Sequence, residues 1–188
     1  IDIGLGPHPL INNVYHKRAL VLSSFSAETF CVSPYFITSE FDKIFADGKG
    51  SKFFLLRKFF ALIRVYTWSI LRHRCHYLYF KGGALGSLPV LSLIEPYLYK
   101  IANVRTVLMP YGGDVQTMSR TKNLIYKRAL GTDYPEFYKS DRETTRRVKM
   151  WEIHADHIIC GADWVDYVDH WHSLMLGHFS IDTELWNC

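Results

Sequence analysis

Glycines recur in this chain directly after segments that are predicted to be strands. They stand at four places along the sequence: Gly4 and Gly6, Gly82 and Gly83, Gly112 and Gly113, and Gly161. Glycine at the carboxyl end of a parallel strand permits unusual backbone angles and lets a ligand come close to the chain. A helix that starts after such a turn also offers free N–H groups to an anion. Each glycine by itself is explained by a tight turn, but four sites at successive strand ends favour a ligand-binding cleft.

Two pairs of histidines have a spacing that metal-binding sites also use. His154 and His157 form an H-x-x-H motif, with Cys160 three residues further along, and His170 and His172 form a second pair. The predicted change from helix to strand between His154 and His157 puts their side chains on different faces, so we expect no zinc site.

The elements that must position these residues follow from an alternation of short apolar runs and helical stretches, which is typical of parallel βαβ units. We expect strands over 1–4, 29–32, 76–80, 104–109 and 157–160, with a further candidate over 174–179. We expect helices over 13–24, 52–73, 88–102 and 163–170, and two more within 122–154 around Gly131 and Pro135. The sequence therefore predicts an α/β fold over residues 1–188: one Rossmann-like domain, a parallel sheet flanked by helices.

The composition is that of a folded globular chain. Of its 188 residues 48% are apolar and 21% charged, which fits one α/β domain and argues against disorder. The four cysteines, Cys31, Cys75, Cys160 and Cys188, form no CxxC unit and are expected to be reduced thiols of a cytosolic protein.

A net charge of +4 is too small to predict nucleic acid as a partner. The positive excess is concentrated in residues 120–149, which hold nine basic and four acidic side chains. This segment can attract a phosphorylated or acidic acceptor, and a solvated helical face is the simpler alternative.

Two common nucleotide-binding motifs are absent. A dinucleotide site needs G-x-G-x-x-G, but Gly4-Leu5-Gly6 is followed by Pro7 and lacks the third glycine. Glu28 stands at the start of the second predicted strand, whereas an acid that binds ribose stands at its end. No G-K-[ST] sequence is present, so a P-loop is also excluded.

Several motifs, in this order and spacing, resemble those of GT-B glycosyltransferases, nearest to the large retaining family often numbered four. The first loop and helix match at G-L-G-P-H-P over 4–9 and N-N-V-Y-H over 12–16. The loop after the fourth strand matches at M-P-Y-G-G-D over 109–114, although Tyr111 stands where that family often has His. The last matches are A-D-H-I-I-C over 155–160, A-D-W over 162–164 and S-I-D-T-E-L-W over 180–186.

The resemblance implies that the chain is the N-terminal, acceptor-binding half of a GT-B enzyme, with residues 180–188 starting the linker to a C-terminal domain. That missing domain would bind the donor, a nucleotide sugar that serves as co-substrate, and no other cofactor is expected. The whole enzyme would transfer the sugar to a glycan or lipid-linked acceptor, and the isolated chain is expected to show no turnover. The alternative is a non-catalytic binding or assembly module on the same fold.

The resemblance also names a site. Asp114 would act as a general base in an inverting enzyme or orient the sugar in a retaining one, and an equal alternative is a turn or capping role. On the catalytic alternative, Asp114→Ala lowers turnover without loss of the fold. Loop 4–9 would offer N–H groups to the leaving diphosphate. The expected substrate-binding residues are Gly4, Gly6, His8, Asn12, His16, Gly82, Gly83, Tyr111, Gly112, Gly113 and Gly161. For Asn12, and for Asn13 beside it, the alternative is a helix cap, and for His16 it is a surface position.

The predicted helix over 52–73 bears on membrane contact. Its charges Arg57, Lys58, Arg64 and Arg72 fall on one side and argue against a transmembrane span. Its wide apolar face suits either a core helix with a solvated stripe or an interfacial helix. We therefore expect a cytoplasmic protein with possible peripheral contact to a membrane.

Overall fold

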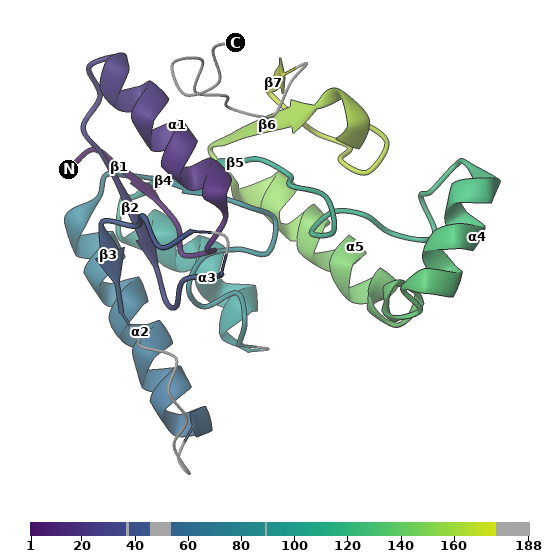
Figure 1. Ribbon diagram of the computed structural model, residues 1–188, viewed down its shortest axis with the longest axis horizontal. Helices are drawn as coiled ribbons and strands as arrows, with labels where there is room; N and C mark the ends of the chain where they lie inside the picture. Colours follow the sequence, from purple (N-terminus) through teal and green to yellow (C-terminus); the bar gives the residue numbers. More distant parts are fainter. Residues whose placement is uncertain (37, 46–53, 89, 176–188) are drawn as a thin grey trace. The chain divides into compact units, whose positions relative to one another are not determined.

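The computed structural model describes residues 1–175 apart from 37, 46–53 and 89. Its strands are β1 (Ile3–Leu5), β2 (Ala27–Cys31), β3 (Lys43–Ile44), β4 (Cys75–Leu78), β5 (Arg105–Leu108), β6 (His157–Gly161) and β7 (Ser173–Met175). Its helices are α1 (Ile11–Leu22), α2 (Phe54–Arg72), α3 (Leu91–Ile101), α4 (Leu124–Asp133) and α5 (Glu136–His154), with a 3-10 turn at Ala162–Trp164. Helices separate most successive strands along the chain (Figure 1).

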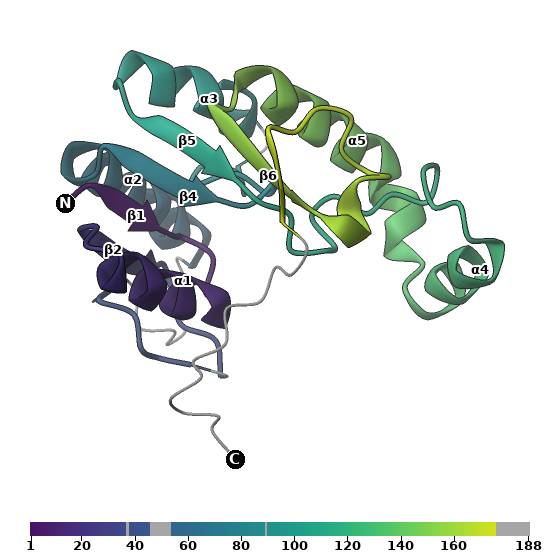
Figure 2. The same cartoon turned by 90° about the horizontal axis from the view of Figure 1, so that it is seen from above.

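The strands form one seven-stranded sheet in the order β3-β2-β1-β4-β5-β6-β7. Neighbouring strands run parallel, as the arrows of β1 and β4 in Figure 2 show. The order places β1 and β4 side by side at the centre of the sheet. The chain runs outward from β1 to the edge strand β3, crosses back to β4 and then runs outward to β7. The α/β class and the Rossmann-like parallel sheet with flanking helices are thus confirmed.

The chain divides into two compact units. The first contains Ile1–Leu78 and Gly82–Thr106, and the second contains Tyr79–Lys81 and the described residues from Val107 onward. The organisation of 1–188 as a single domain stays a prediction.

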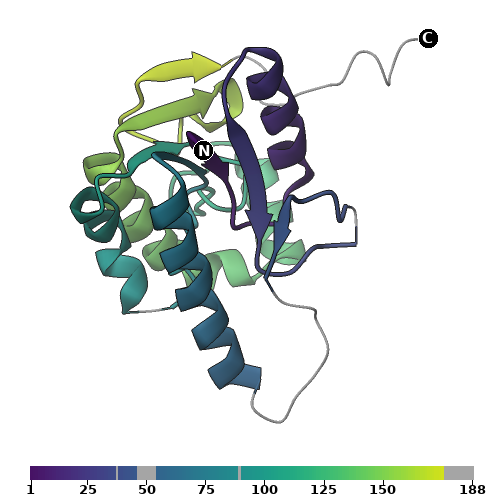
Figure 3. The same ribbon diagram turned by 90° about the vertical axis from the view of Figure 1, so that its left-hand side faces the viewer.

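Each unit has its own core. In the first unit, α1 lies alongside β2 (Figure 3), and Leu5, Phe30 and Val65 are among the fully buried side chains. In the second unit, Trp151 of α5 and Ile158 of β6 are completely buried. Burial of such large apolar side chains is what stabilises the strands, because each strand alone is too short to be stable.

Most predicted elements are present, with three differences. The helix expected over 163–170 is wrong: only the 3-10 turn Ala162–Trp164 forms, because Glu152 accepts the N–H groups of Asp169 and His170 in place of helical carbonyls. Strand β3 was not predicted; it is two residues long and pairs with the end of β2. The last predicted strand begins earlier, as β7, and its residues beyond Met175, like the linker 180–188, lie outside the described residues.

Candidate functional site

Asp114 is the centre of the candidate site in the second unit, and it is fully buried. Its Oδ2 accepts the Phe80 N–H at 2.9 Å, and its Oδ1 accepts those of Tyr111 and Gly112 at 3.0 Å each. Burial raises the pKa of Asp114 to about 6, against the opposing effect of the backbone N–H groups. The carboxylate therefore joins the segment after β4 to the loop after β5. This geometry favours the turn role over that of a base, and it replaces our expectation that Asp114→Ala leaves the fold intact.

Arg147 of α5 binds the same two segments from the other side. Its Nε donates to the Phe80 carbonyl at 3.0 Å and its Nη2 to the Asp114 carbonyl at 3.2 Å. Arg147 was not among the predicted site residues and was only one of the charges of the basic segment 120–149. A usable signal was present, since Thr144, Val148 and Trp151 mark the buried face of α5 at helical spacing and Arg147 lies on that side.

Tyr111 and Lys81 are the polar groups that this arrangement brings towards solvent. The Lys81 ammonium lies near the Tyr111 hydroxyl, and Lys81 is exposed while Tyr111 is half-buried. Burial, followed by the charge of Asp114, raises the pKa of Tyr111, and Lys81 opposes this. The Tyr111 ring packs edge-on against Tyr79, with 5.2 Å between ring centroids. Lys81 was not among the predicted site residues.

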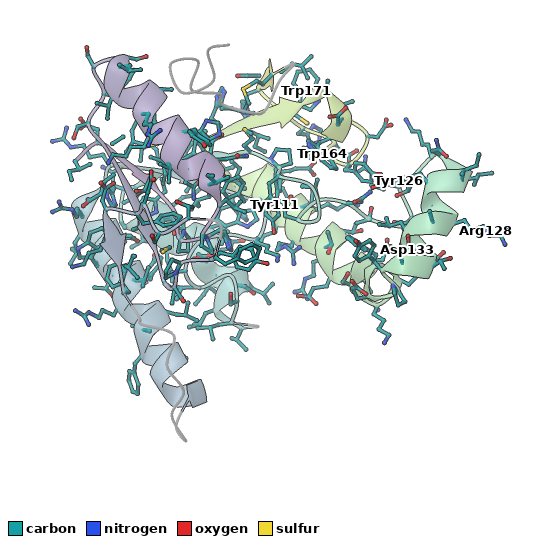
Figure 4. The ribbon with its side chains drawn as sticks, viewed as in Figure 1. Tyr111, Tyr126, Arg128, Asp133, Trp164 and Trp171 are labelled. Carbon is teal, nitrogen blue, oxygen red and sulfur yellow. The ribbon has the colours of Figure 1, made fainter. Side chains whose placement is uncertain are left out.

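The loop after β6 also reaches this site. Gly112 has a φ of +129°, which few side chains tolerate, and a Cβ there would stand 3.3 Å from the Trp164 ring. Tyr111 and Trp164 are shown on these neighbouring loops in Figure 4.

The two other predicted glycines of this unit lie apart from that contact. Gly113 is exposed. Gly161 does not follow β6 as predicted; it is the last residue of that strand and pairs with Met175.

A second meeting of strand-end loops lies within the first unit. His8 Nε2 is 3.0 Å from the Gly82 carbonyl, and the Asn13 side chain donates to the His8 carbonyl at 2.8 Å. The loop after β1, with buried Gly6, therefore contacts the loop that begins at Gly82. Gly4 does not belong to that loop: it lies inside β1, where a Cβ would stand 2.6 Å from the His73 ring.

The remaining predicted residues on α1 take ordinary positions. Asn12 is half-exposed and does not cap the helix, whose first residue follows Leu10 without a side-chain cap. The alternative of a cap at Asn12 is therefore wrong. His16 is half-buried beside the Tyr77 ring, at 5.3 Å between centroids, and burial lowers its pKa. His16 is thus partly exposed, and its role stays a prediction.

Glu95 of α3 shapes the second glycine loop and was not among the predicted site residues. It is completely buried, and its carboxylate accepts the N–H groups of Gly83 at 2.9 Å and Leu85 at 2.8 Å. Burial raises the pKa of Glu95 to about 7. An acid between apolar residues in the run L-S-L-I-E-P was the available signal.

The histidine motifs hold β6 and β7 together. The His157 and His172 rings stack at 4.9 Å, His157 Nε2 lies 2.6 Å from the Ser173 hydroxyl, and His172 Nδ1 accepts the Ile158 N–H. Within the described part of the chain, no three His, Cys, Asp or Glu side chains gather as a metal would require. None of the described helices is long and apolar enough to cross a membrane.

Comparison of the chain with models of protein families, with curated proteins and with solved structures gave no match. The GT-B resemblance therefore stays a prediction.

Proposed function

We propose that this chain is the acceptor-binding half of a GT-B glycosyltransferase, which transfers a sugar from a nucleotide sugar to a glycan or lipid-linked acceptor. The observation that carries the proposal is the meeting of the segments after β4, β5 and β6 around Asp114, with Lys81 and Tyr111 at the exposed side. Ligands of parallel sheets bind at this edge, beyond the carboxyl ends of strands.

The residues take distinct roles in this proposal. The Lys81 ammonium and Tyr111 hydroxyl contact a sugar hydroxyl or a phosphate oxygen, because they are donors close to solvent. Asp114 and Arg147 are positioning residues that hold the loops carrying those donors. In the first unit, the loop around His8 is proposed to contact the diphosphate of the donor.

The proposal also includes a second domain and a place of action in the cell. A second Rossmann-like domain binds the nucleotide sugar, and the protein acts in the cytoplasm, in peripheral contact with a membrane where the acceptor is lipid-linked.

A nucleotide-sugar consumption screen on the full-length protein tests the proposal. We expect one donor to be consumed, and Lys81→Ala or Tyr111→Phe to lower turnover by roughly tenfold or more, the effect of losing a polar contact to a charged group. Lys139→Ala, on the exposed side of α5, is the matched control and should retain normal turnover. Melting temperatures should be unchanged in all three variants.

The alternative, a non-catalytic binding module, is favoured by one observation. Asp114 is fully buried and both of its oxygens accept backbone N–H groups, which is the arrangement of a structural rather than a catalytic carboxylate. Glycan binding that depends on Lys81, together with no consumption of any nucleotide sugar by the full-length protein, would select this alternative.

A further inference from the structure

A groove that is open to solvent runs along α5 in the second unit. Its four cations are exposed and lie on one side of the helix: Lys139, Arg142, Arg146 and Lys149. At 3.6 residues per turn and 1.5 Å per residue, they fall within roughly 80° of one another and form a stripe roughly 15 Å long. The other residues that line this α5 groove are polar or acidic: Ser119, Asp141, Glu143 and Thr145. The groove therefore offers charge and hydrogen bonds, and none of its described lining residues is apolar.

The structure divides the basic segment 120–149 into cations that already have partners and cations that do not. Arg120 and Lys122 form ion pairs with aspartates, and Arg147 donates to backbone carbonyl groups of the candidate site. The four cations of the α5 groove form no ion pair with any residue in the described part of the chain. These four charges are therefore available to an anion from outside the chain.

The two acids of the α5 groove leave this stripe uncompensated. Asp141 Oδ1 accepts the Ser119 N–H at 2.9 Å and so holds the loop after β5 against α5. Glu143 lies on the other edge of the stripe, 3.9 Å from Arg147 Nη1, and its side chain is 81% exposed. The groove thus presents a row of cations with a hydrogen-bond acceptor beside it.

We propose that the α5 groove binds a linear glycan that carries carboxylate or phosphate groups. Arg142 and Arg146 bind its anionic groups, since a guanidinium donates two parallel hydrogen bonds to a carboxylate or a phosphate. The lysines at the two ends of the stripe extend this contact. Ser119 and Glu143 bind the hydroxyl groups between the charges. Neither Lys81 nor the other proposed substrate-binding residues line the groove, so this inference does not depend on the transferase activity.

Other polyanions match the α5 groove less well. A membrane surface requires apolar side chains that enter the acyl region, and the described lining of the groove has none. Duplex DNA carries one charge for about every 1.7 Å of its axis, so its phosphates would meet Asp141 and Glu143 as well as the cations. A single strand binds by stacking its bases on aromatic rings, which this lining also lacks. A glycan places neutral hydroxyl groups between its anions and fits a groove of both kinds.

Calorimetric titration of the full-length protein with defined glycans tests the proposal. The probes are a hexamer of galacturonic acid, a phosphomannan fragment and neutral maltohexaose. We expect at least one of the two anionic probes to bind, more weakly as salt is raised, and maltohexaose not to bind. The two anionic probes distinguish a carboxylate from a phosphate as the group that is recognised. Consumption of nucleotide sugars in the same preparations reports the transferase separately.

Arg142→Gln with Arg146→Gln should weaken binding of the anionic probe by roughly tenfold, because two charge contacts are lost. Lys127→Gln with Arg128→Gln is the matched control: it removes the same charge from the same basic segment but outside the groove, and it should bind like the unchanged protein. Equal weakening in both variants, or no binding of either anionic probe, overturns the proposal. Binding of DNA or of anionic vesicles that requires Arg142 and Arg146, without binding of the glycans, would assign the groove to that polyanion instead.

Discussion

At the level of single residues, two buried carboxylates hold the loops that follow β4 and β5. Glu95 binds the Gly83 and Leu85 N–H groups, and Asp114 binds those of Phe80, Tyr111 and Gly112. A buried carboxylate is costly unless such donors surround it. The conformation of each loop therefore depends on the hydrogen bonds of one buried side chain. At the candidate site, the positions of Lys81 and Tyr111 depend on Asp114 in this way.

Replacement of Asp114 tests this role. Asp114→Ala leaves three N–H groups without their acceptor, so the free energy of unfolding should fall by roughly 3 kcal/mol or more. Asp114→Asn should lose less, because one oxygen remains as an acceptor. Urea unfolding gives both values. Exposed Asp163→Ala is the control and should change stability by less than about 0.5 kcal/mol. A similar small change for Asp114→Ala would contradict the anchoring role.

At the level of elements, the two consecutive helices of the second unit differ in what stabilises them. Helix α5 places Thr144, Val148 and Trp151 on one buried face, so packing supports it. Helix α4 has ten residues and buries only Leu130 among them, so it depends more on its ends. Asn123 supplies the N-terminal cap, since its Oδ1 accepts the N–H groups of Ile125 and Tyr126 at 3.0 Å each.

The cap predicts a local effect. Asn123→Ala should destabilise α4 by about 1 kcal/mol and speed hydrogen exchange of its amides roughly fivefold. Asn123→Asp should restore protection, because Asp caps equally well and its charge suits the helix N-terminus. Asn12→Ala is the control, since α1 has no side-chain cap, and exchange in α1 should stay unchanged. Unchanged exchange in α4 after Asn123→Ala would show that packing alone holds it.

For the whole molecule, buried histidines and buried carboxyl groups have opposite effects on how the free energy of unfolding changes with pH. Burial lowers the pKa of His16, His73 and His76, that of His76 to about 3 with a further contribution from the charge of His73. Each histidine therefore stabilises the fold above its unfolded pKa and loses this contribution as pH falls. Glu95 and Asp114 have raised pKa values, so they stabilise the fold at low pH and lose their contributions as pH rises through about 7 and about 6.

The sign of the net effect can be measured. Between about pH 7 and about pH 5 the three histidines lower the free energy of unfolding on acidification, whereas Glu95 and Asp114 raise it. Glu95→Gln removes one of the groups that favour the acidic condition. Acidification should therefore lower the free energy of unfolding more, or raise it less, in the variant than in the unchanged protein. Urea unfolding of both proteins at both pH values gives this difference. A change in the opposite direction would show that Glu95 is ionised in the folded protein.

Local pattern was enough to predict much of the fold. The alternation of apolar runs and helical stretches placed β1, β2, β4, β5 and β6 within a few residues, because strand and helix periods are properties of neighbouring residues. The break between α4 and α5 was predicted from a single residue, because Pro135 cannot continue the preceding helix. Strand β3 carries no such pattern: it has two residues, and only its pairing with Phe30 and Cys31 makes it a strand.

The sequence by itself determined the parallel α/β class and the glycine-rich loops at its strand ends. The tertiary structure decided where the side chains of those loops lie: Asp114 and Glu95 are buried, Gly4 lies inside β1, and Lys81 lies near Tyr111. It also decided that Leu124 and Ile125 face water. The physical reason is that burial and hydrogen-bond partners come from distant residues. Phe80 and Asp114, for example, are 34 positions apart, and no local period encodes their contact.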